Sequence, residues 1–315
     1  MRPYFAFERI RDGVLSTSAE LYGVRFERRT DVETWHASVE CFDVLDGEAV
    51  VARFFLDMHP RENKFKHAAM FDLSVAGDDV LPEAVLVCNF PEPNGDDPAL
   101  LLHDEVTTFF HEFGHLLHHL FAGRQTFTAF SGIATEWDFV EVPSQAYEEW
   151  AWAPEVLARF ATHVETGAPI PADLVERMRA ADACGRAGFV LGQMYFAQLS
   201  LGYYDRDPST FDPLEKLKEL RAMLCTPHEE GTHFHVAFGH LNGYSALYYT
   251  YMWSLVIAKD VVAAFGGDWL DRATAQRYRE AILAPGGSRD AAELVRAFLG
   301  RDYAFDAFAD WLAAS

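Results

Sequence analysis

Thr108–Phe121 reads TFFHEFGHLLHHLF, an uninterrupted apolar stretch that contains the pattern H-E-x-x-H. On a helix, His111 and His115 lie one turn apart on the same face, roughly 5–6 Å from each other, so two imidazole nitrogens can share one metal ion. Glu112 points toward the same cavity but is poorly placed to bind the ion, which leaves it free to take a proton from water. The stretch therefore predicts a helix that holds zinc and a general base.

Two further histidines lie in the same stretch. His115 and His119 are also four residues apart, and His118 lies beside them. Neither alternative pair has a carboxylate in the position of the base, so we expect His118 and His119 to pack in the core or to support the ligands from outside. The simplest alternative to the whole pattern is a set of core or surface histidines without a metal.

A third ligand is required, because a catalytic zinc ion keeps three protein ligands and one water. A third histidine on the same helix is absent, since Phe121 stands at its position. Downstream, Asp138–Gln145 reads DFVEVPSQ, and its Glu141 lies at the start of an apolar helix, where an unpaired charge is costly. We expect Glu141 to bind the metal; the alternative is a carboxylate that only stabilises the helix terminus.

The remaining pattern predicts an α+β fold, mostly α, in which a helical zincin-like unit packs beside a small, largely antiparallel sheet. We expect one catalytic domain, 1–315, with a sheet-containing part over about 1–97 and a helical part over 98–315, because no linker or repeat divides the chain. The predicted strands are Glu48–Asp57, Lys66–Leu73 and Ala84–Asn89. The predicted helices are Glu105–Phe121, Pro143–Phe160, Pro171–Gly202, Pro213–Leu224, Gly243–Phe265, Ala273–Leu283 and Ala291–Leu299.

Composition narrows the class of protein. The formal charge of −22 argues against nucleic acid and anionic membrane surfaces as partners, because both require clustered Lys and Arg. The longest apolar run, Tyr244–Ala258, is shorter than a bilayer span, and residues 1–13 lack the apolar stretch of a signal peptide. Cys41, Cys88, Cys184 and Cys225 are far apart, as expected of buried, reduced thiols. We therefore expect a cytoplasmic protein.

Further stretches carry distinctive sequence in a fixed order. They are Trp35-His36, Leu56–Ala69 (LDMHPRENKFKHAA), Val87–Pro93 (VCNFPEP), Ser131–Gln145 (SGIATEWDFVEVPSQ), Gly239–Trp253 (GHLNGYSALYYTYMW), Ile282–Ser288 (ILAPGGS) and Phe298–Arg301 (FLGR). Together with the histidine stretch, they resemble the thimet oligopeptidase, oligopeptidase A and peptidyl-dipeptidase family of zinc metallopeptidases. The resemblance extends from about Tyr4 to Leu312.

The resemblance implies hydrolysis of short peptides with one Zn²⁺ per chain. It implies that His111, His115 and Glu141 bind the ion and that Glu112 is the base. It also places a histidine and tyrosines over the cleft, with catalytic roles for His240, Tyr244 and Tyr251 and a substrate contact for Tyr248. The tyrosines are spaced to project from one helical face, and a core aromatic stripe is the alternative for them.

Three departures from the family pattern stand out. Only three residues separate His240 from Tyr244, fewer than is usual in the family. Thr107 stands where many members have a glutamate near the metal, and Glu105 is the candidate to replace it. The family's upstream helical region, which encloses the substrate channel, is missing. The chain is then a minimal version with an open cleft, or a catalytic half that needs a partner chain or a second copy.

Two readings compete with a working peptidase. One is a non-catalytic relative that keeps the zinc and the peptide cleft, and the other is a fragment that folds only with its missing half. In the catalytic reading, Tyr251 or Tyr244 stabilises the oxyanion. The segment Asp57–Lys64 is expected to offer a sheet edge to an extended peptide.

Overall fold

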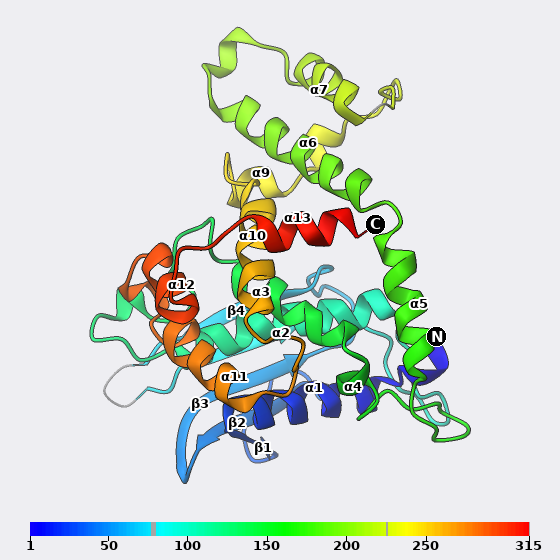
Figure 1. The fold of residues 1–315 in the computed structure, drawn as a ribbon, viewed down its shortest axis with the longest axis vertical. Helices are drawn as coiled ribbons and strands as arrows, with labels where there is room; N and C mark the ends of the chain where they lie inside the picture. Colours follow the sequence, from blue (N-terminus) through cyan, green and yellow to red (C-terminus); the bar gives the residue numbers. More distant parts are fainter. Residues whose placement is uncertain (77–79, 225, 315) are drawn as a thin grey trace.

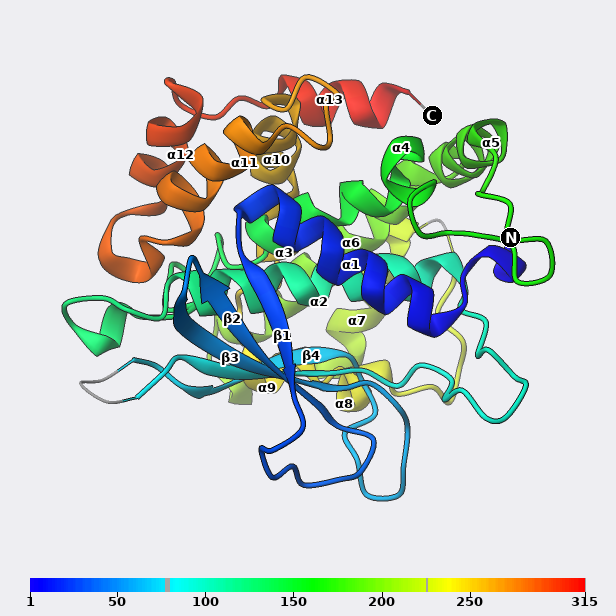
Figure 2. The ribbon, with the colours of Figure 1, turned by 90° about the horizontal axis from the view of Figure 1, so that it is seen from below.

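The computed structural model describes residues 1–76, 80–224 and 226–314. Figure 1 shows a sheet and the long helix α2 (His103–Phe121) in the lower part, and helices α6 (Arg186–Tyr204), α7 (Pro213–Arg221) and α9 (His240–Gly243) in the upper part. Figure 2, seen from below, shows α1 (Phe7–Tyr22) running alongside α2. The α+β architecture with mostly helices agrees with the prediction.

The sheet has five strands in the order β1-β2-β3-β5-β4. The pairs β1–β2, β2–β3 and β5–β4 are antiparallel, but β3 and β5 are parallel, so the sheet is mixed and the prediction of an antiparallel sheet is wrong in this respect. The cause is the position of β4. It lies at the edge of the sheet, so β5 pairs with β3 and runs in the same direction as β3. The strands are β1 Arg25–Arg29, β2 Glu40–Asp46, β3 Ala49–Asp57, β4 Ala69–Ser74 and β5 Glu83–Val87.

The three predicted strands correspond to β3, β4 and β5, and a turn at Asp46-Gly47 joins β2 to β3, with Gly47 at φ +62°. The segment Asp57–Lys64, however, is not a sheet edge, because Asp57 ends the interior strand β3 and the chain then leaves the sheet. Among the described residues, β4 is the edge strand that lines the same cleft as His111 and His115.

The helical part is more broken than its apolar periodicity suggests. The predicted helix Pro143–Phe160 is interrupted before Pro154, and Pro171–Gly202 is divided at Gly185, whose φ of +100° ends one helix and starts the next. The α-helices beyond α2 are α3 Val142–Tyr147, α4 Pro154–Leu157, α5 Ala172–Ala183, α6 Arg186–Tyr204, α7 Pro213–Arg221, α8 Phe234–Ala237, α9 His240–Gly243, α10 Thr250–Ala263, α11 Arg272–Tyr278, α12 Ala291–Leu299 and α13 Asp306–Ala313. The single turns are 3₁₀ helices at Arg2–Tyr4, Thr128–Phe130, Glu148–Trp152, Pro208–Thr210, Ala222–Leu224 and Gly286–Ser288, and a π-helix at Arg279–Leu283.

The hydrophobic interior is divided into two main units. The larger, which we call the body, joins the sheet, α1, α2, α3 and α10 to α12 around side chains such as Phe54, Phe113 and Leu116. The smaller, which we call the upper wall, consists of α6 to α9 and their connections, and is centred on Tyr195, Leu217 and Phe238. The candidate site lies where these two units meet.

Two predictions about environment are tested in part. Cys41 and Cys88 are buried as expected, Cys184 is exposed, and Cys225 lies outside the described residues. Among the described helices, none combines the length and the hydropathy that a membrane crossing requires. The cytoplasmic location remains a prediction.

Candidate metal centre and cleft

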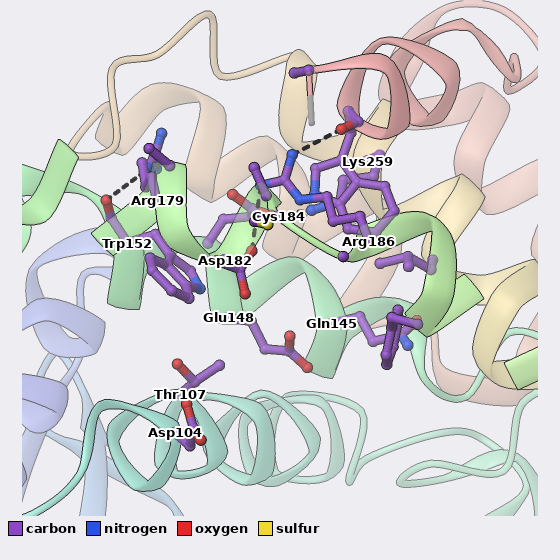
Figure 3. A pocket seen from close by; sticks show the side chains of 18 residues that line it. Asp104, Thr107, Gln145, Glu148, Trp152, Arg179, Asp182, Cys184, Arg186 and Lys259 are labelled. Atoms are coloured by element: carbon purple, nitrogen blue, oxygen red, sulfur yellow. Dashed lines mark hydrogen bonds and ion pairs between the residues drawn. The ribbon is translucent and has the colours of Figure 1, made fainter. Parts of the chain in front are cut away.

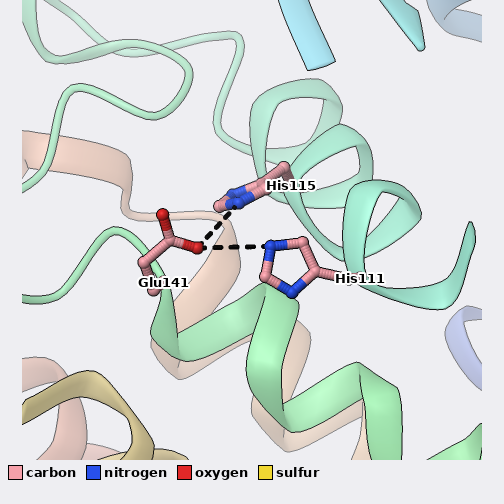
Figure 4. Close-up of side chains that lie close together, drawn as sticks. All are labelled: His111, His115 and Glu141. Atoms are coloured by element: carbon pink, nitrogen blue, oxygen red, sulfur yellow. Dashed lines mark hydrogen bonds and ion pairs between the residues drawn. The ribbon is translucent and has the colours of Figure 1, made fainter. Parts of the chain in front are cut away.

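His111, His115 and Glu141 converge on one point between α2 and α3 (Figure 4). Nε2 of His111 lies 3.3 Å and Nε2 of His115 lies 3.1 Å from Oε2 of Glu141. Two ligand atoms at about 2.0–2.1 Å from a tetrahedral ion are about 3.3 Å apart, so both separations suit a shared zinc ion. The three predicted ligands are therefore brought together, and their donor set fits the metal.

The carboxylate reaches the imidazoles because α2 and α3 touch backbone to backbone. A Cβ atom on Gly114 would lie 2.7 Å from Cα of Ser144 and 2.8 Å from the carbonyl oxygen of Pro143, so only glycine fits there. Glu141 immediately precedes α3 and is only 2% exposed. The hydroxyl of Ser144 donates to its Oε2 at 3.1 Å.

A second carboxylate supports His111 from outside the metal position. Nδ1 of His111 and Oε1 of Glu148 are 2.6 Å apart, which orients the ring so that Nε2 faces Glu141. This contact replaces the one sought at Glu105, which instead accepts a hydrogen bond from the amide of Leu102 at the start of α2. Sequence reasoning missed Glu148, although it follows Glu141 by seven residues, which is two helical turns on the same face.

Burial and neighbouring charges shift the pKa values of His111 and Glu141 in opposite directions. Burial opposes a charged His111, but hydrogen bonds and charges of Glu141 and Glu148 prevail and raise its pKa. Burial would raise the pKa of Glu141, yet the attraction of His115 and the hydrogen bond of His111 lower it well below its usual range. The carboxylate is thus ionised, as a metal ligand must be, whereas His111 would have to release the proton that these carboxylates favour before it could bind a metal ion.

Glu112 is held by the edge of the sheet. Its side chain is 8% exposed, and the amide of Met70 on β4 donates to its Oε2 at 2.9 Å. The side chain faces the same cleft as the three candidate ligands. The sequence could not indicate this contact, because the Met70 amide is a backbone group and does not depend on the type of side chain.

The tyrosines approach the site from the junction of the body and the upper wall. The predicted helix over Gly243–Phe265 is wrong before Thr250, because residues 244–249 form turns with Ser245 at φ +49°. The rings of Tyr244 and Tyr251 nevertheless stack with centroids 5.5 Å apart, and the hydroxyl of Tyr244 donates to Oε1 of Glu141 at 2.9 Å. The grouping of these side chains therefore arises from turns and not from one helical face.

Burial is the main cause of the high pKa values of the tyrosines. Burial and the carboxylate of Glu141 raise the pKa of both Tyr244 and Tyr251, so each hydroxyl keeps its proton at neutral pH. Tyr248 is 8% exposed, its hydroxyl donates to Gln193 at 3.1 Å, and burial raises its pKa to about 12. Tyr248 thus presents its ring and not its hydroxyl to the cleft.

His240 lies at the first position of α9 with its side chain exposed to the cleft. Its ring centroid is 5.6 Å from that of Tyr244, 5.1 Å from Tyr248 and 5.9 Å from Tyr251. The structure thus groups His240 with all three tyrosines, despite the short connection to Tyr244.

The two additional histidines of α2 take other roles. His119 contacts the carbonyl oxygen of Ser74 at 3.1 Å and lines the cleft beyond the metal position. His118 is fully buried, and neither of its ring nitrogens has a hydrogen-bond partner in the described part of the chain. Neither joins the three candidate ligands, in agreement with the prediction.

The site opens into a cleft of about 1430 Å³ that runs between β4, α2 and the upper wall. A second cavity of about 770 Å³ lies on the other side of His111, where Glu148 forms part of its lining (Figure 3). In that cavity, charged groups pair with each other, as Arg186 does with Asp182 and Lys259 with Glu149. The cleft is therefore the space that adjoins the metal position and Glu112.

Solved structures of peptidases share this fold. The chain superposes on Pz peptidase A with an inhibitor with a TM-score of 0.58 and 14% identity, covering 82% of this chain and 43% of that one. It superposes on a carboxypeptidase of Pyrococcus furiosus with a TM-score of 0.54 and 14% identity, covering 97% and 58%. At these identities the likeness concerns the fold alone.

The chain belongs to Peptidase family M3, whose profile matches residues 1–313. It is 37% identical over 322 residues to oligopeptidase A of Escherichia coli (strain K12), which covers 98% of this chain and 47% of that protein. It is also 37% identical to dipeptidyl carboxypeptidase of Salmonella typhimurium over 96% and 46%, and 34% identical to saccharolysin of Saccharomyces cerevisiae over 97% and 46%. The family resemblance is confirmed, and the chain spans about half the length of these relatives.

Proposed function

We propose that this chain is a zinc-dependent peptidase that hydrolyses short peptides. The observation that carries the proposal is the convergence of Nε2 of His111 and His115 on Oε2 of Glu141, at separations suited to one tetrahedral ion. A zinc ion bound there would act as a Lewis acid and lower the pKa of a water molecule toward about 7. Membership in a peptidase family supports the same assignment.

Glu112 serves as the general base in this proposal. It takes a proton from the attacking water and returns it to the amine of the leaving peptide, a role worth about 10²–10⁴ in rate. The amide of Met70 fixes one carboxylate oxygen, so the other is directed to the proton. Because β4 is short and paired on one side only, this hydrogen bond also ties the position of the base to the sheet edge.

The tyrosine hydroxyls stabilise the negative charge that develops on the scissile carbonyl oxygen. Tyr251 is the better candidate, because the hydroxyl of Tyr244 donates to the candidate ligand Glu141, whereas that of Tyr251 is hydrogen-bonded only to another hydroxyl, that of Tyr244, among the contacts described. Tyr244 then holds the carboxylate ligand in place, and His240 adds a further donor beside both rings. Tyr248 contributes an apolar ring surface to substrate binding.

Peptide backbone is recognised by the outer edge of β4, which has no strand partner among the described residues and whose Met70 amide already donates to Glu112. An extended peptide can add as a further strand there, and main-chain hydrogen bonds then supply affinity with little dependence on sequence. The cleft is formed within residues 1–315, which we propose as one catalytic domain. The relatives are about twice as long as the chain described here, and a partner chain or a second copy is one way in which the open cleft could be covered further.

The test is hydrolysis of a quenched fluorescent peptide by the purified chain, with zinc, with a chelator, and with zinc restored. We expect turnover that is lost with the chelator and regained with the ion, and about one zinc per chain by elemental analysis. Zinc and peptide binding without any turnover would instead identify a non-catalytic relative. Absence of zinc binding, with the fold intact, would exclude the proposal.

A further inference from the structure

Tyr251 lies where two differently supported segments of the chain meet. Residues 244–249 before it form turns, whereas α10, which begins at Thr250, packs in the body. Tyr244 is tied to the body directly, because its hydroxyl donates to Glu141 at 2.9 Å. For Tyr251, the hydroxyl contacts only that of Tyr244 among the contacts described. The position of Tyr251 relative to Glu141 therefore depends on how the start of α10 is held.

Two hydroxyl side chains join the start of α10 to the segment that leads into Glu141. The hydroxyl of Thr250 donates to the carbonyl oxygen of Trp137 at 2.6 Å, and that of Ser254 donates to the carbonyl oxygen of Asp138 at 2.9 Å. Both side chains are fully buried. A hydroxyl within a helix commonly bonds to a carbonyl oxygen in the preceding turn of its own helix. These two bond to another segment instead, so they fix α10 against it.

Gln145 makes a third connection, from the opposite direction. It follows Glu141 by one turn on α3, and its Nε2 donates to the carbonyl oxygen of Tyr251 at 3.0 Å. The backbone of Tyr251 is thus held on both sides, by Thr250 before it and through its own carbonyl group. Hydrogen bonds depend on direction as well as distance, so these contacts orient the backbone there.

These three side chains lie outside the substrate cleft. Tyr251 is among the described residues that line the cleft, but Gln145, Thr250 and Ser254 are not. Gln145 lines the second cavity instead, next to Glu148 (Figure 3). None of the three therefore meets a peptide in the cleft, and any effect that they have on turnover must pass through another residue.

We infer that Gln145, Thr250 and Ser254 are positioning residues that set the place of the Tyr251 hydroxyl relative to the metal position. Because this hydroxyl lies at the far end of the side chain, a small rotation of the backbone at Tyr251 displaces it. A misplacement of about 1 Å can lower a rate by about 10²-fold. The consequence for turnover rests on the proposed function, whereas the statement about position does not.

Substitutions that remove one donor and keep the shape of the side chain test the inference. Gln145→Met and Thr250→Val should each lower kcat about tenfold to hundredfold, with KM within about threefold, because a transition-state contact is displaced while substrate binding is not. Thr250→Ser keeps the hydroxyl and should stay within about threefold of the parent kcat. Gln276→Met is the matched control, because the amide of Gln276 donates to Glu280 on the surface. Parent-level kcat in both Gln145→Met and Thr250→Val would overturn the inference.

A double substitution separates positioning from a general loss of structure. In the Tyr251→Phe background no hydroxyl is left to position, so Gln145→Met should lower kcat by less than about a further threefold. Losses that multiply in the double variant would show that Gln145 acts independently of the Tyr251 hydroxyl, against the inference.

Fluorine NMR measures position without turnover. 3-Fluorotyrosine in place of Tyr251 in the zinc-loaded chain reports the surroundings of that ring, which stacks on Tyr244 with centroids 5.5 Å apart. We expect the resonance to shift or broaden in Gln145→Met and Thr250→Val, and to stay in place in Thr250→Ser and Gln276→Met. An unchanged resonance in the first two variants would refute the positioning.

The kinetic and spectroscopic results together separate this inference from the proposed function. A resonance that changes as expected in a chain without hydrolysis would contradict the proposed function and leave the positioning intact. Hydrolysis by the parent chain, with kcat and the resonance both unchanged in the variants, would leave the function intact and contradict the positioning.

Discussion

The body and the upper wall both line the cleft, but the body has a much larger hydrophobic core than the upper wall. The candidate ligands and Glu112 belong to α2 and to the start of α3, which are embedded in the large cluster around Phe113 and Leu116. Tyr248 belongs to the small cluster of the upper wall, and Tyr251 packs against it. The proposed metal site is thus anchored in the interior of the body, while the proposed transition-state contacts depend on the smaller hydrophobic cluster. Substitutions in the two units should therefore affect zinc binding and turnover separately.

The largest effect on turnover is expected from Glu112, the residue of the body that we propose as the general base. Glu112→Gln should lower kcat by about 10²–10⁴, because the amide cannot accept the proton of water, while zinc content stays at the parent level. Steady-state kinetics and elemental analysis of the same preparation measure both. Asp104→Asn, an exposed carboxylate change on the same helix, is the control and should be neutral. Parent-level kcat in the glutamine variant would refute the base assignment.

Core truncation tests whether the two units unfold separately. Leu116→Ala in the body should reduce the free energy of unfolding by about 2–5 kcal/mol, because a fully buried side chain leaves a cavity. Leu217→Ala in the upper wall should increase hydrogen exchange in α6 and α7 and lower turnover, with zinc content retained. Equal shifts of a single denaturation transition in both variants would mean that the units are one cooperative structure.

The two tyrosine hydroxyls offer a finer comparison at the junction. Tyr251→Phe should lower kcat by about 10²–10³ through loss of an oxyanion donor. Tyr248→Phe should change kcat less than about threefold, because that hydroxyl is bonded to Gln193 and not directed at the substrate. Kinetics with one peptide suffices. Comparable losses in both variants would show that Tyr248 also acts through its hydroxyl.

A substitution of Glu148 tests whether a residue that is not itself a proposed ligand strengthens zinc binding through His111. Glu148→Gln should weaken zinc affinity by about tenfold to hundredfold, because His111 loses the carboxylate that orients its ring. Competition with a chelating dye measures this change. The adjacent Glu149→Gln should leave affinity unaltered, since Glu149 pairs with Lys259. If both variants behave alike, the effect is one of overall charge and not of ring orientation.

The smallest effect concerns pH and the interior of the body. Burial, and then the charges of His115 and His119, lower the pKa of His118 to about 3, whereas an unfolded histidine has a pKa of about 6.5. Below pH 6.5 the unfolded chain binds a proton that the folded chain rejects, so stability is lost as pH falls from 6.5 toward 3. At pH 5 the loss is about 2 kcal/mol relative to pH 7. His118→Leu should flatten this part of the pH–stability curve, measured by urea denaturation; an unchanged slope would contradict the assignment.

Local patterns in the sequence were sufficient for the metal helix and for three strands. The apolar run around His111 and His115 predicts α2 to within two residues, because its periodicity and its charged start agree. Pairing in the sheet was not predictable, since nothing in β4 or β5 specifies that β4 moves to the edge. Two strands were missed: Arg25–Arg29 reads RFERR, whose charges hide an edge strand, and Glu40–Asp46 reads ECFDVLD, in which acidic residues interrupt the apolar run. The start of α1 was missed as well, because no capping side chain marks it.

For the site, side-chain identity was informative and backbone geometry was not. Glu141 stands out because a charge in an apolar helix start needs a partner. Glu148 and Glu149 are adjacent glutamates, and only the direction of each side chain shows that Glu148 meets His111 while Glu149 meets Lys259. The turns over 244–249 escaped detection because their tyrosine spacing imitates a helix. The assignment of catalytic roles to these residues remains a prediction.

The contact at Gly114 has a consequence for ion selection. Because main-chain atoms of the two helices meet there, the gap between imidazole and carboxylate is set by the backbone, which is stiffer than any rotamer. If this distance is fixed, the site favours ions of one size. Calcium, with oxygen distances near 2.3–2.6 Å and six or more ligands, would require the two helices to move apart. The small size of Gly114 in α2 would therefore favour the proposed zinc ion over calcium.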